Sequence, residues 1–289
     1  MDTQFTDNKS STSRPIWLFF GLAMILSWVI WIPMILFVPE NAQLPLLLLG
    51  GFGPFMSALI VIRIKEGKTA LKQWLRETFR LRIGLIWYLV GGLFLPFGIA
   101  ILHHSFYILA GGRSGFSLDQ IWGIYVVSLF STTLLGGGFE EPGWRGFATP
   151  RLMTRFHPIL ANTIVSFFWV LWHIPLYFGN WGGKGQPLLW FFIYAIGLSI
   201  ILTWLYFKSG KSIIPVMLLH GATNIVFDFF PATNTIFSSP DLDFNIFKSM
   251  SYWTVAIVII LATKGQLGYS IKSQEERTRN KQQVEATHA

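Results

Sequence analysis

Two adjacent carboxylates, Glu140 and Glu141, stand in a stretch that is otherwise typical of a membrane span. A charge near the bilayer centre costs about 2.5–3.5 kcal/mol on insertion scales, so such residues need partners and usually serve a function. Arg145 follows Glu141 by four residues, which would place both on one face of a helix. Pro142 frees a backbone carbonyl, which at membrane depth is tolerated only beside protein or a watery cavity. We therefore predict that this stretch lines a cavity inside a helical membrane protein.

Two other apolar runs also carry polar side chains at helical spacing. His173 follows Trp169 by four residues, and His220 precedes Asn224 by four, so each pair would share a helix face. Taken alone, an intramembrane histidine often only bonds a neighbouring carbonyl, and a His–Asn pair can be an interhelical clamp. Together with the two acids, these side chains form a set that could hydrolyse a substrate.

Such a set suits hydrolysis in two ways, and the residues do not choose between them. In one, Glu140, His173 and His220 bind a zinc ion whose fourth position holds water, the usual arrangement of a catalytic zinc site. In the other, no metal is needed: a glutamate oriented by a histidine takes a proton from water as general base. The second histidine and Asn224 then donate hydrogen bonds to the developing oxyanion, worth about 2.7–4 kcal/mol per donor.

Familiar soluble-enzyme motifs are missing from the sequence. It contains no His-Glu-x-x-His, Gly-x-Ser-x-Gly or phosphate-binding loop, and no cysteine. These absences argue against a zincin, a serine hydrolase, a cysteine protease and an ATPase.

Composition predicts an all-α, polytopic membrane protein. Hydrophobic residues make up 52% of the 289 residues and charged residues only 12%, compared with about 25% charged in soluble domains. The net charge of +8 falls in short segments beside the spans. That distribution favours cytoplasmic loops over nucleic-acid binding.

The apolar runs predict about eight transmembrane helices that enclose a cytoplasm-facing polar cavity. Their expected ranges are 16–38, 44–63, 85–110, 121–141, 158–178, 187–207, 212–230 and 249–263. With both termini in the cytoplasm, all lysines and arginines except Arg113, Lys184 and Lys248 fall on the inner side, in accord with the positive-inside rule. No inverted repeat is visible, which argues against a transporter.

Three regions are expected along the chain. Residues 1–15 form a polar N-terminal tail, and 16–263 form a single membrane domain whose catalytic core spans about 120–230. Within that domain, Leu71, Trp74 and Phe79 recur at helical spacing among basic residues, which indicates a surface amphipathic helix at about 64–82. Residues 264–289 form a charged, disordered tail.

Three motifs in order resemble those of the CAAX-protease and bacteriocin-processing family, also called the Abi family. They are Glu-Glu-Pro-Gly-Trp-Arg-Gly-Phe at 140–147, Trp-x-x-x-His ending at His173, and His-x-x-x-Asn at 220–224. The second has Trp169 where the family usually has phenylalanine, a change between large aromatic residues that we expect to matter little.

The resemblance implies an intramembrane endopeptidase in which Glu140 activates water, with Glu141 and Arg145 in support and His173, His220 and Asn224 completing the site. Members are commonly labelled metalloproteases, although a metal-free glutamate mechanism is also argued. The implied partners are the bilayer and a peptide or protein substrate, either CAAX-like and lipidated or related to bacteriocins. The chief alternative is a non-catalytic membrane immunity protein that binds a toxin. Eight spans with no organelle-targeting segment are typical of a prokaryotic plasma membrane.

Overall fold

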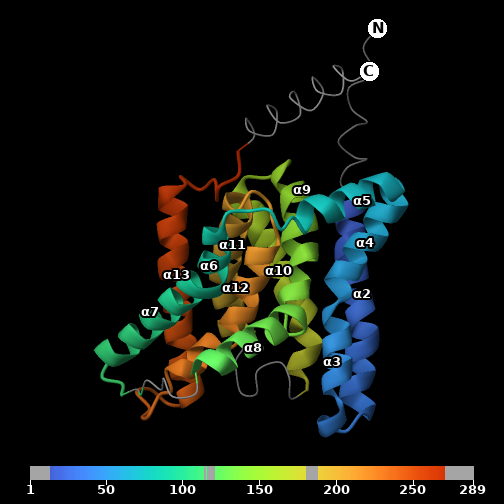
Figure 1. Ribbon diagram of the computed structural model, residues 1–289. Coiled ribbons are helices and arrows are strands. Elements are labelled where there is room, and N and C mark those ends of the chain that lie inside the picture. Colours follow the sequence, from blue (N-terminus) through green and yellow to red (C-terminus); the bar gives the residue numbers. More distant parts are fainter. Residues whose placement is uncertain (1–13, 114, 116–120, 180–187, 271–289) are drawn as a thin grey trace.

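The computed structural model describes residues 14–113, 115, 121–179 and 188–270, and these residues form helices with no β-strand (Figure 1). Most of the two predicted tails, residues 1–13 and 271–289, lies outside the described residues. The predicted disorder of the C-terminal tail therefore stays a prediction.

Six helical stretches in the described part of the chain are long and apolar enough to cross a membrane. They are α2 (Arg14–Phe37), α3 (Leu44–Gly51) with α4 (Gly53–Lys65), α6 (Leu85–Leu89) with the π-turn η2 (Val90–Phe94) and α7 (Leu95–Leu109), α10 (Pro158–Tyr177), α11 (Leu188–Lys208) and α13 (Pro240–Ala262). Large apolar side chains point outward from them, among them Val29 and Val258, 66% and 60% exposed. An apolar outer surface on long helices is what a bilayer requires, so the chain is a multi-pass, all-α membrane protein.

The boundaries of the other two predicted spans, and of the last one, were wrong. The span 121–141 is not one helix: α8 (Ile121–Leu134) ends before the glycines, because Gly137 has φ +115°, a conformation that breaks a right-handed helix. The span 212–230 ends early as α12 (Ile214–Thr223), followed by a separate 3₁₀ turn η5 (Val226–Phe229). The span 249–263 was too short, because α13 begins at Pro240 after an N-cap in which Ser239 accepts the Leu242 amide at 3.2 Å.

Short irregular elements join these helices. A 3₁₀ turn η1 (Glu40–Ala42) precedes α3, and α5 (Gly67–Thr78) follows α4. After α8 come the 3₁₀ turn η3 (Gly138–Glu140), the π-helix η4 (Pro142–Ala148) and α9 (Thr149–Met153). The chain is thus least regular where the two glutamates lie.

Helix α5 has the amphipathic pattern predicted for 64–82. Leu71, Trp74 and Phe79 are partly buried, whereas Lys72 and Arg76 are exposed. Trp74 Nε1 donates to the Gly146 carbonyl at 3.0 Å and so ties α5 to η4. Figure 1 shows α5 at the same end of the molecule as α9. Its location on a membrane surface stays a prediction.

Aromatic packing and polar clamps hold α2, η4 and α10 together. The Phe19 ring lies 5.4 Å from Trp144 and 4.9 Å from Phe147. Trp172 Nε1 donates to Ser27 Oγ at 2.6 Å, and Trp28 Nε1 donates to the Trp172 carbonyl at 2.9 Å. These buried bonds fix the register of α2 against α10, the helix that carries His173.

A second clamp fixes α10 against α11. Asn162 Oδ1 accepts hydrogen bonds from Ser199 at 2.9 Å and Thr203 at 2.8 Å. Earlier in α11, a side chain at Gly197 would meet the Tyr252 Cβ of α13 at 3.2 Å, so these two helices also pack closely. The helices on both sides of the site are therefore fixed by specific contacts.

Candidate active site

The break after α8 determines where the two glutamates point. Gly138 sits against α8 so closely that a Cβ there would lie 2.1 Å from the Thr133 carbonyl oxygen. The chain then turns through η3 into the π-helix η4, with Pro142 in its first turn. Single π-turns are frequent at functional sites, because the wider turn redirects side chains. Here Glu140 and Glu141, although adjacent, come to lie in different surroundings.

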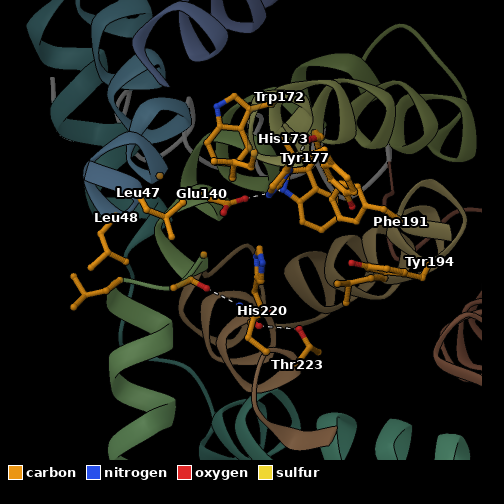
Figure 2. A pocket seen from close by; sticks show the side chains of 18 of the residues that line it. Leu47, Leu48, Glu140, Trp172, His173, Tyr177, Phe191, Tyr194, His220 and Thr223 are labelled. Atoms are coloured by element: carbon orange, nitrogen blue, oxygen red, sulfur yellow. Dashed lines mark hydrogen bonds between the residues drawn. The ribbon is translucent and has the colours of Figure 1, made fainter. Parts of the chain in front are cut away.

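Glu140 lines a cavity of about 400 Å³. Its side chain is 6% exposed, and its Oε2 accepts a hydrogen bond from Trp169 Nε1 at 2.7 Å. His173, His220 and Asn224 line the same cavity. In Figure 2, Glu140 and His173 lie on one side, and the His220 ring points toward them from the other. The structure thus brings together four of the six predicted site residues around one space.

Glu141 and Arg145 lie behind the cavity wall and are fully buried. Arg145 Nη1 pairs with Glu141 Oε1 at 3.0 Å, which confirms the predicted contact between residues four apart. The same oxygen lies 2.6 Å from His220 Nδ1. Because an ionised carboxylate can only accept, Nδ1 carries the proton of this bond and Nε2 is the ring nitrogen left for the cavity.

The bond between Glu141 and His220 has a chemical consequence. A carboxylate behind a histidine fixes the ring's tautomer and orientation and stabilises the imidazolium form. Gly137 leaves room for that ring, since a Cβ at this position would lie 2.8 Å from His220 Nε2. Glu141 is therefore a positioning residue that acts through His220.

His173 stands in an aromatic cage on α10. Its ring centre lies 4.6 Å from Trp172, 5.1 Å from Phe191 and 5.4 Å from Trp169. Nδ1 donates to the Trp169 carbonyl at 2.8 Å, so Nε2 is again the nitrogen without a backbone partner. Residue counts along the helices suggest that His173 lies deeper than Glu140. The two still line one cavity, because Trp169, one helical turn earlier, links them.

Asn224 donates one amide hydrogen to the glycine segment that precedes the two glutamates. Its Nδ2 donates to the Gly136 carbonyl at 2.6 Å, which joins the end of α12 to the end of α8. An amide nitrogen carries two hydrogens, so one donor remains for a ligand in the cavity.

Trp169 is the residue whose importance the sequence interpretation underestimated. Its indole donates to Glu140, its carbonyl accepts from His173, and its ring lies 5.6 Å from the His220 ring. The Arg145 guanidinium carbon lies 5.2 Å from the same ring. A phenylalanine could pack here but could not donate, so the tryptophan N–H was the signal available in the sequence.

Lys248 was also misplaced by the sequence interpretation, which put it in an outer loop. It lies within α13 and lines the cavity. The misplaced start of the last span explains the error.

The donor types of Glu140, His173 and His220 suit zinc, and each histidine has the Nδ1 partner that typically orients a metal ligand. Whether they bind a zinc ion stays a prediction. Across the described ranges, no three His, Cys, Asp or Glu side chains form a group that could hold a metal ion. We therefore derive no step through a metal.

Comparison with known proteins agrees with this geometry. Residues 122–226, which carry all six predicted site residues, match the family described as type II CAAX prenyl endopeptidase Rce1-like. A curated relative, the CAAX prenyl protease 2 of Methanococcus maripaludis, is 28% identical over 239 residues. That alignment covers 76% of this chain and 82% of the relative.

A helical membrane fold, a cavity lined by one glutamate and two histidines, and these matches together define a class: the protein is an intramembrane endopeptidase, a hydrolase of peptide bonds. Within that class, its residues 122–226 are similar to the Rce1-like type II CAAX prenyl endopeptidases.

Proposed function

We propose that this protease cleaves a peptide bond with a water molecule activated by Glu140. The observation that carries the proposal is the difference between the surroundings of the two glutamates. Glu140 faces the cavity and is held by a single neutral donor, whereas Glu141 is fully buried behind the cavity wall, where its Oε1 contacts both Arg145 and His220. A carboxylate at the edge of a cavity can reach a bound water, and one paired with two cations cannot.

In the proposed reaction, Glu140 takes a proton from water while the oxygen attacks the carbonyl carbon of the scissile bond. Negative charge then develops on the carbonyl oxygen. His220, which Glu141 stabilises as the imidazolium, donates a hydrogen bond from Nε2 to that oxygen, and the free amide hydrogen of Asn224 adds a second bond. Glu140 finally returns its proton to the leaving amine. Every proton in this sequence moves between groups of the chain, the water and the substrate.

His173 bounds the cavity beside Glu140. Its aromatic cage keeps water from three of its sides, and its Nε2 can accept or donate toward a substrate carbonyl or the water. We assign it the orientation of the reacting groups.

The substrate class follows from two observations. The cavity is lined largely by aromatic and aliphatic side chains, among them Trp31, Leu47, Leu176 and Phe191. A relative that is 28% identical to this chain over 239 residues is named CAAX prenyl protease 2. We propose a protein or peptide whose end reaches the membrane, such as a lipidated or strongly apolar C-terminus.

We also propose that both termini lie on the cytoplasmic side of a prokaryotic membrane. Whether the cavity faces that side stays a prediction. Support comes from basic segments that gather at one end: Arg151 pairs with Glu66 at 2.8 Å, and Arg80 donates to the Gly210 carbonyl at 2.6 Å. Basic residues concentrate on the cytoplasmic side of membrane proteins.

The test compares new N-termini and C-termini of membrane proteins in cells that make either the wild type or Glu140→Gln. Glutamine keeps the shape and the bond from Trp169 but cannot take a proton, so we expect the new ends to disappear. Glu66→Gln, which alters an exposed ion pair far from the cavity, is the matched control and should cleave like the wild type. If wild type and Glu140→Gln yield the same ends and the same phenotype, the catalytic proposal fails in favour of a binding or immunity protein.

A further inference from the structure

Helix α5 carries a stripe of basic side chains on its outer face. Lys68, Lys72 and Arg76 follow one another at intervals of four residues, so they share one face of the helix, and all three are exposed. Within the described ranges, none of the three forms an ion pair. The stripe is therefore available to an anionic partner that the protein itself does not supply.

The acidic residues of this segment do not balance its positive charge. Between residues 63 and 82 the sequence holds seven basic residues and two acidic ones. Of the two acids, Glu66 pairs with Arg151 of α9 at 2.8 Å, and Glu77 accepts from Gln73 Nε2 at 3.0 Å. The excess of positive charge on one exposed helix favours a negatively charged surface as its partner.

Apolar side chains at both ends of α5 place the stripe beside lipid. Ile64, just before the helix, is 66% exposed, and Leu81 and Leu85, just after it, are 67% and 72% exposed. In a helical membrane protein such exposed apolar side chains lie against hydrocarbon, so the chain enters and leaves α5 at the edge of the bilayer core. Figure 1 shows α5 turned across the direction of α2 and α4. This arrangement puts the stripe at the level of the phosphate headgroups.

The inner face of α5 packs against the segment that carries the glutamates. Trp74 Nε1 donates to the Gly146 carbonyl of η4 at 3.0 Å. The Phe79 ring centre lies 6.4 Å from that of Phe139, the residue before Glu140. A displacement of α5 would therefore disturb the turn that presents Glu140 to the cavity.

The C-terminal end of α5 is also tied to the helix that carries His220. The Thr78 carbonyl accepts from the Ile213 amide at 2.9 Å, directly before α12. The Arg80 carbonyl accepts from Ser212 Oγ at 2.8 Å. Helix α5 thus contacts both elements that supply groups to the proposed reaction, the turn with Glu140 and the start of α12.

We propose that the basic stripe of α5 binds the headgroups of anionic phospholipids, and that the bound lipid holds α5 in the position that cleavage requires. Lysine and arginine bind phosphate through charge-assisted hydrogen bonds. Each basic residue near an anionic membrane surface strengthens attachment by about fivefold. The effect of lipid on cleavage rests on the proposed function, whereas the lipid binding does not.

The first experiment measures the lipid around α5 and needs no substrate. Because the sequence contains no cysteine, Thr69→Cys at an exposed position of α5 can carry a single fluorescent donor. The labelled full-length protein is placed in phosphatidylcholine vesicles with a trace of acceptor-labelled phosphatidylglycerol or acceptor-labelled phosphatidylcholine. Energy transfer should show phosphatidylglycerol enriched by at least about fivefold, the effect of one basic residue. The enrichment should fall as the salt rises from about 0.1 M to about 1 M. Equal transfer to the two lipids would overturn the inference and leave the proposed function intact.

Substitutions in the stripe test whether it is the source of the enrichment. Lys68→Gln combined with Lys72→Gln should remove most of it, and arginine at both positions should retain it. The matched control is Lys208→Gln combined with Lys264→Gln, which removes the same charge from exposed positions at the end of α11 and just beyond α13. We expect this control to enrich phosphatidylglycerol like the wild type. Equal losses in the two double variants would reflect net charge alone and would overturn the inference.

The second experiment measures the effect of the lipid on cleavage. Peptides that copy Glu140-dependent ends are supplied at saturation to the full-length protein in vesicles of phosphatidylcholine, with or without phosphatidylglycerol. We expect a kcat about fivefold higher with the anionic lipid, and no difference for Lys68→Gln combined with Lys72→Gln. Trp74→Phe should keep the lipid enrichment and lose the activation, because the bond from α5 to Gly146 is absent.

The outcomes separate the lipid site from the proposed function. Equal kcat in the two membranes, from wild-type protein that does enrich phosphatidylglycerol, would overturn the role of the lipid in cleavage. Activation that survives loss of the stripe would overturn it as well. If no Glu140-dependent cleavage occurs in either membrane, the proposed function fails, and the energy-transfer result still decides whether α5 binds anionic lipid.

Discussion

Glu141 and His220 are joined by a 2.6 Å contact between Oε1 and Nδ1, which ties the irregular turn after α8 to α12. The same carboxylate oxygen also pairs with Arg145. One buried acid therefore orients a histidine of the cavity and neutralises a buried guanidinium.

Removing that acid should cost both stability and activity. Glu141→Gln leaves Arg145 buried without its ion pair, and breaking one partner of a buried pair costs about 3–5 kcal/mol. We expect a lower thermal midpoint in detergent and a loss of cleavage. The double variant Glu141→Gln with Arg145→Met should regain most of the stability, because no unpaired charge remains. It should stay inactive, because His220 still lacks its carboxylate. Recovery of activity in the double variant would contradict the role of Glu141 as a positioning residue.

Gly137→Ala should disable the site through His220. The added Cβ would lie 2.8 Å from His220 Nε2, at a backbone φ of +115° that side-chain-bearing residues rarely adopt. We expect roughly 1–3 kcal/mol of lost stability from strain and a larger loss of kcat. The control is Gly21→Ala in α2, where a Cβ meets nothing within 4 Å. Wild-type cleavage by Gly137→Ala would show that the ring of His220 can move without consequence.

Trp169→Phe should lower kcat/KM by about tenfold or more, because a hydrogen bond to a charged group contributes about 1.5–3 kcal/mol. The substitution keeps the aromatic packing around His173 and removes only the N–H that holds Glu140. Trp253→Phe is the matched control, since its indole donates to the Ile193 carbonyl on α11 and not to a site residue. Equal losses in the two variants would indicate a general packing effect.

Activity should survive removal of metal ions. The described residues do not gather three His, Cys, Asp or Glu donors into one group, and the proposed proton transfers use only Glu140, His220 and the substrate. We expect dialysis against a strong zinc chelator to leave cleavage unchanged and elemental analysis to find less than stoichiometric zinc. Loss of activity on chelation, restored by zinc, would show that Glu140, His173 and His220 move together around a metal ion.

The orientation can be measured directly, because the sequence contains no cysteine. Gln73→Cys on α5 and Ala232→Cys after η5 each introduce one thiol at an exposed position. A maleimide that cannot cross membranes should label Ala232→Cys in intact cells and Gln73→Cys only after permeabilisation. The reverse pattern would place the basic end outside and contradict the cytoplasmic orientation.

The sequence by itself determined the membrane class, most of the helices and the residues of the site. Long apolar runs have few alternatives to helices in a bilayer, because every backbone group must be bonded within the segment. The two glutamates, the two histidines and Asn224 were visible as polar residues in runs that otherwise exclude them. The spacing of Glu141 and Arg145 also sufficed to predict their ion pair, because residues four apart in a helix are neighbours.

Only the tertiary structure decided which of these residues faces the cavity and which ones support it. Whether Glu140 or Glu141 faces the cavity depends on the glycine break, which packs against α8 and α12, and on the π-helix η4, which packs against α4. The donation from Trp169 to Glu140 joins residues far apart in the chain, so no local spacing could reveal it. Lys248 entered the cavity because Ser239 and Pro240 start α13 before its most apolar part, and a hydropathy pattern detects only that apolar part.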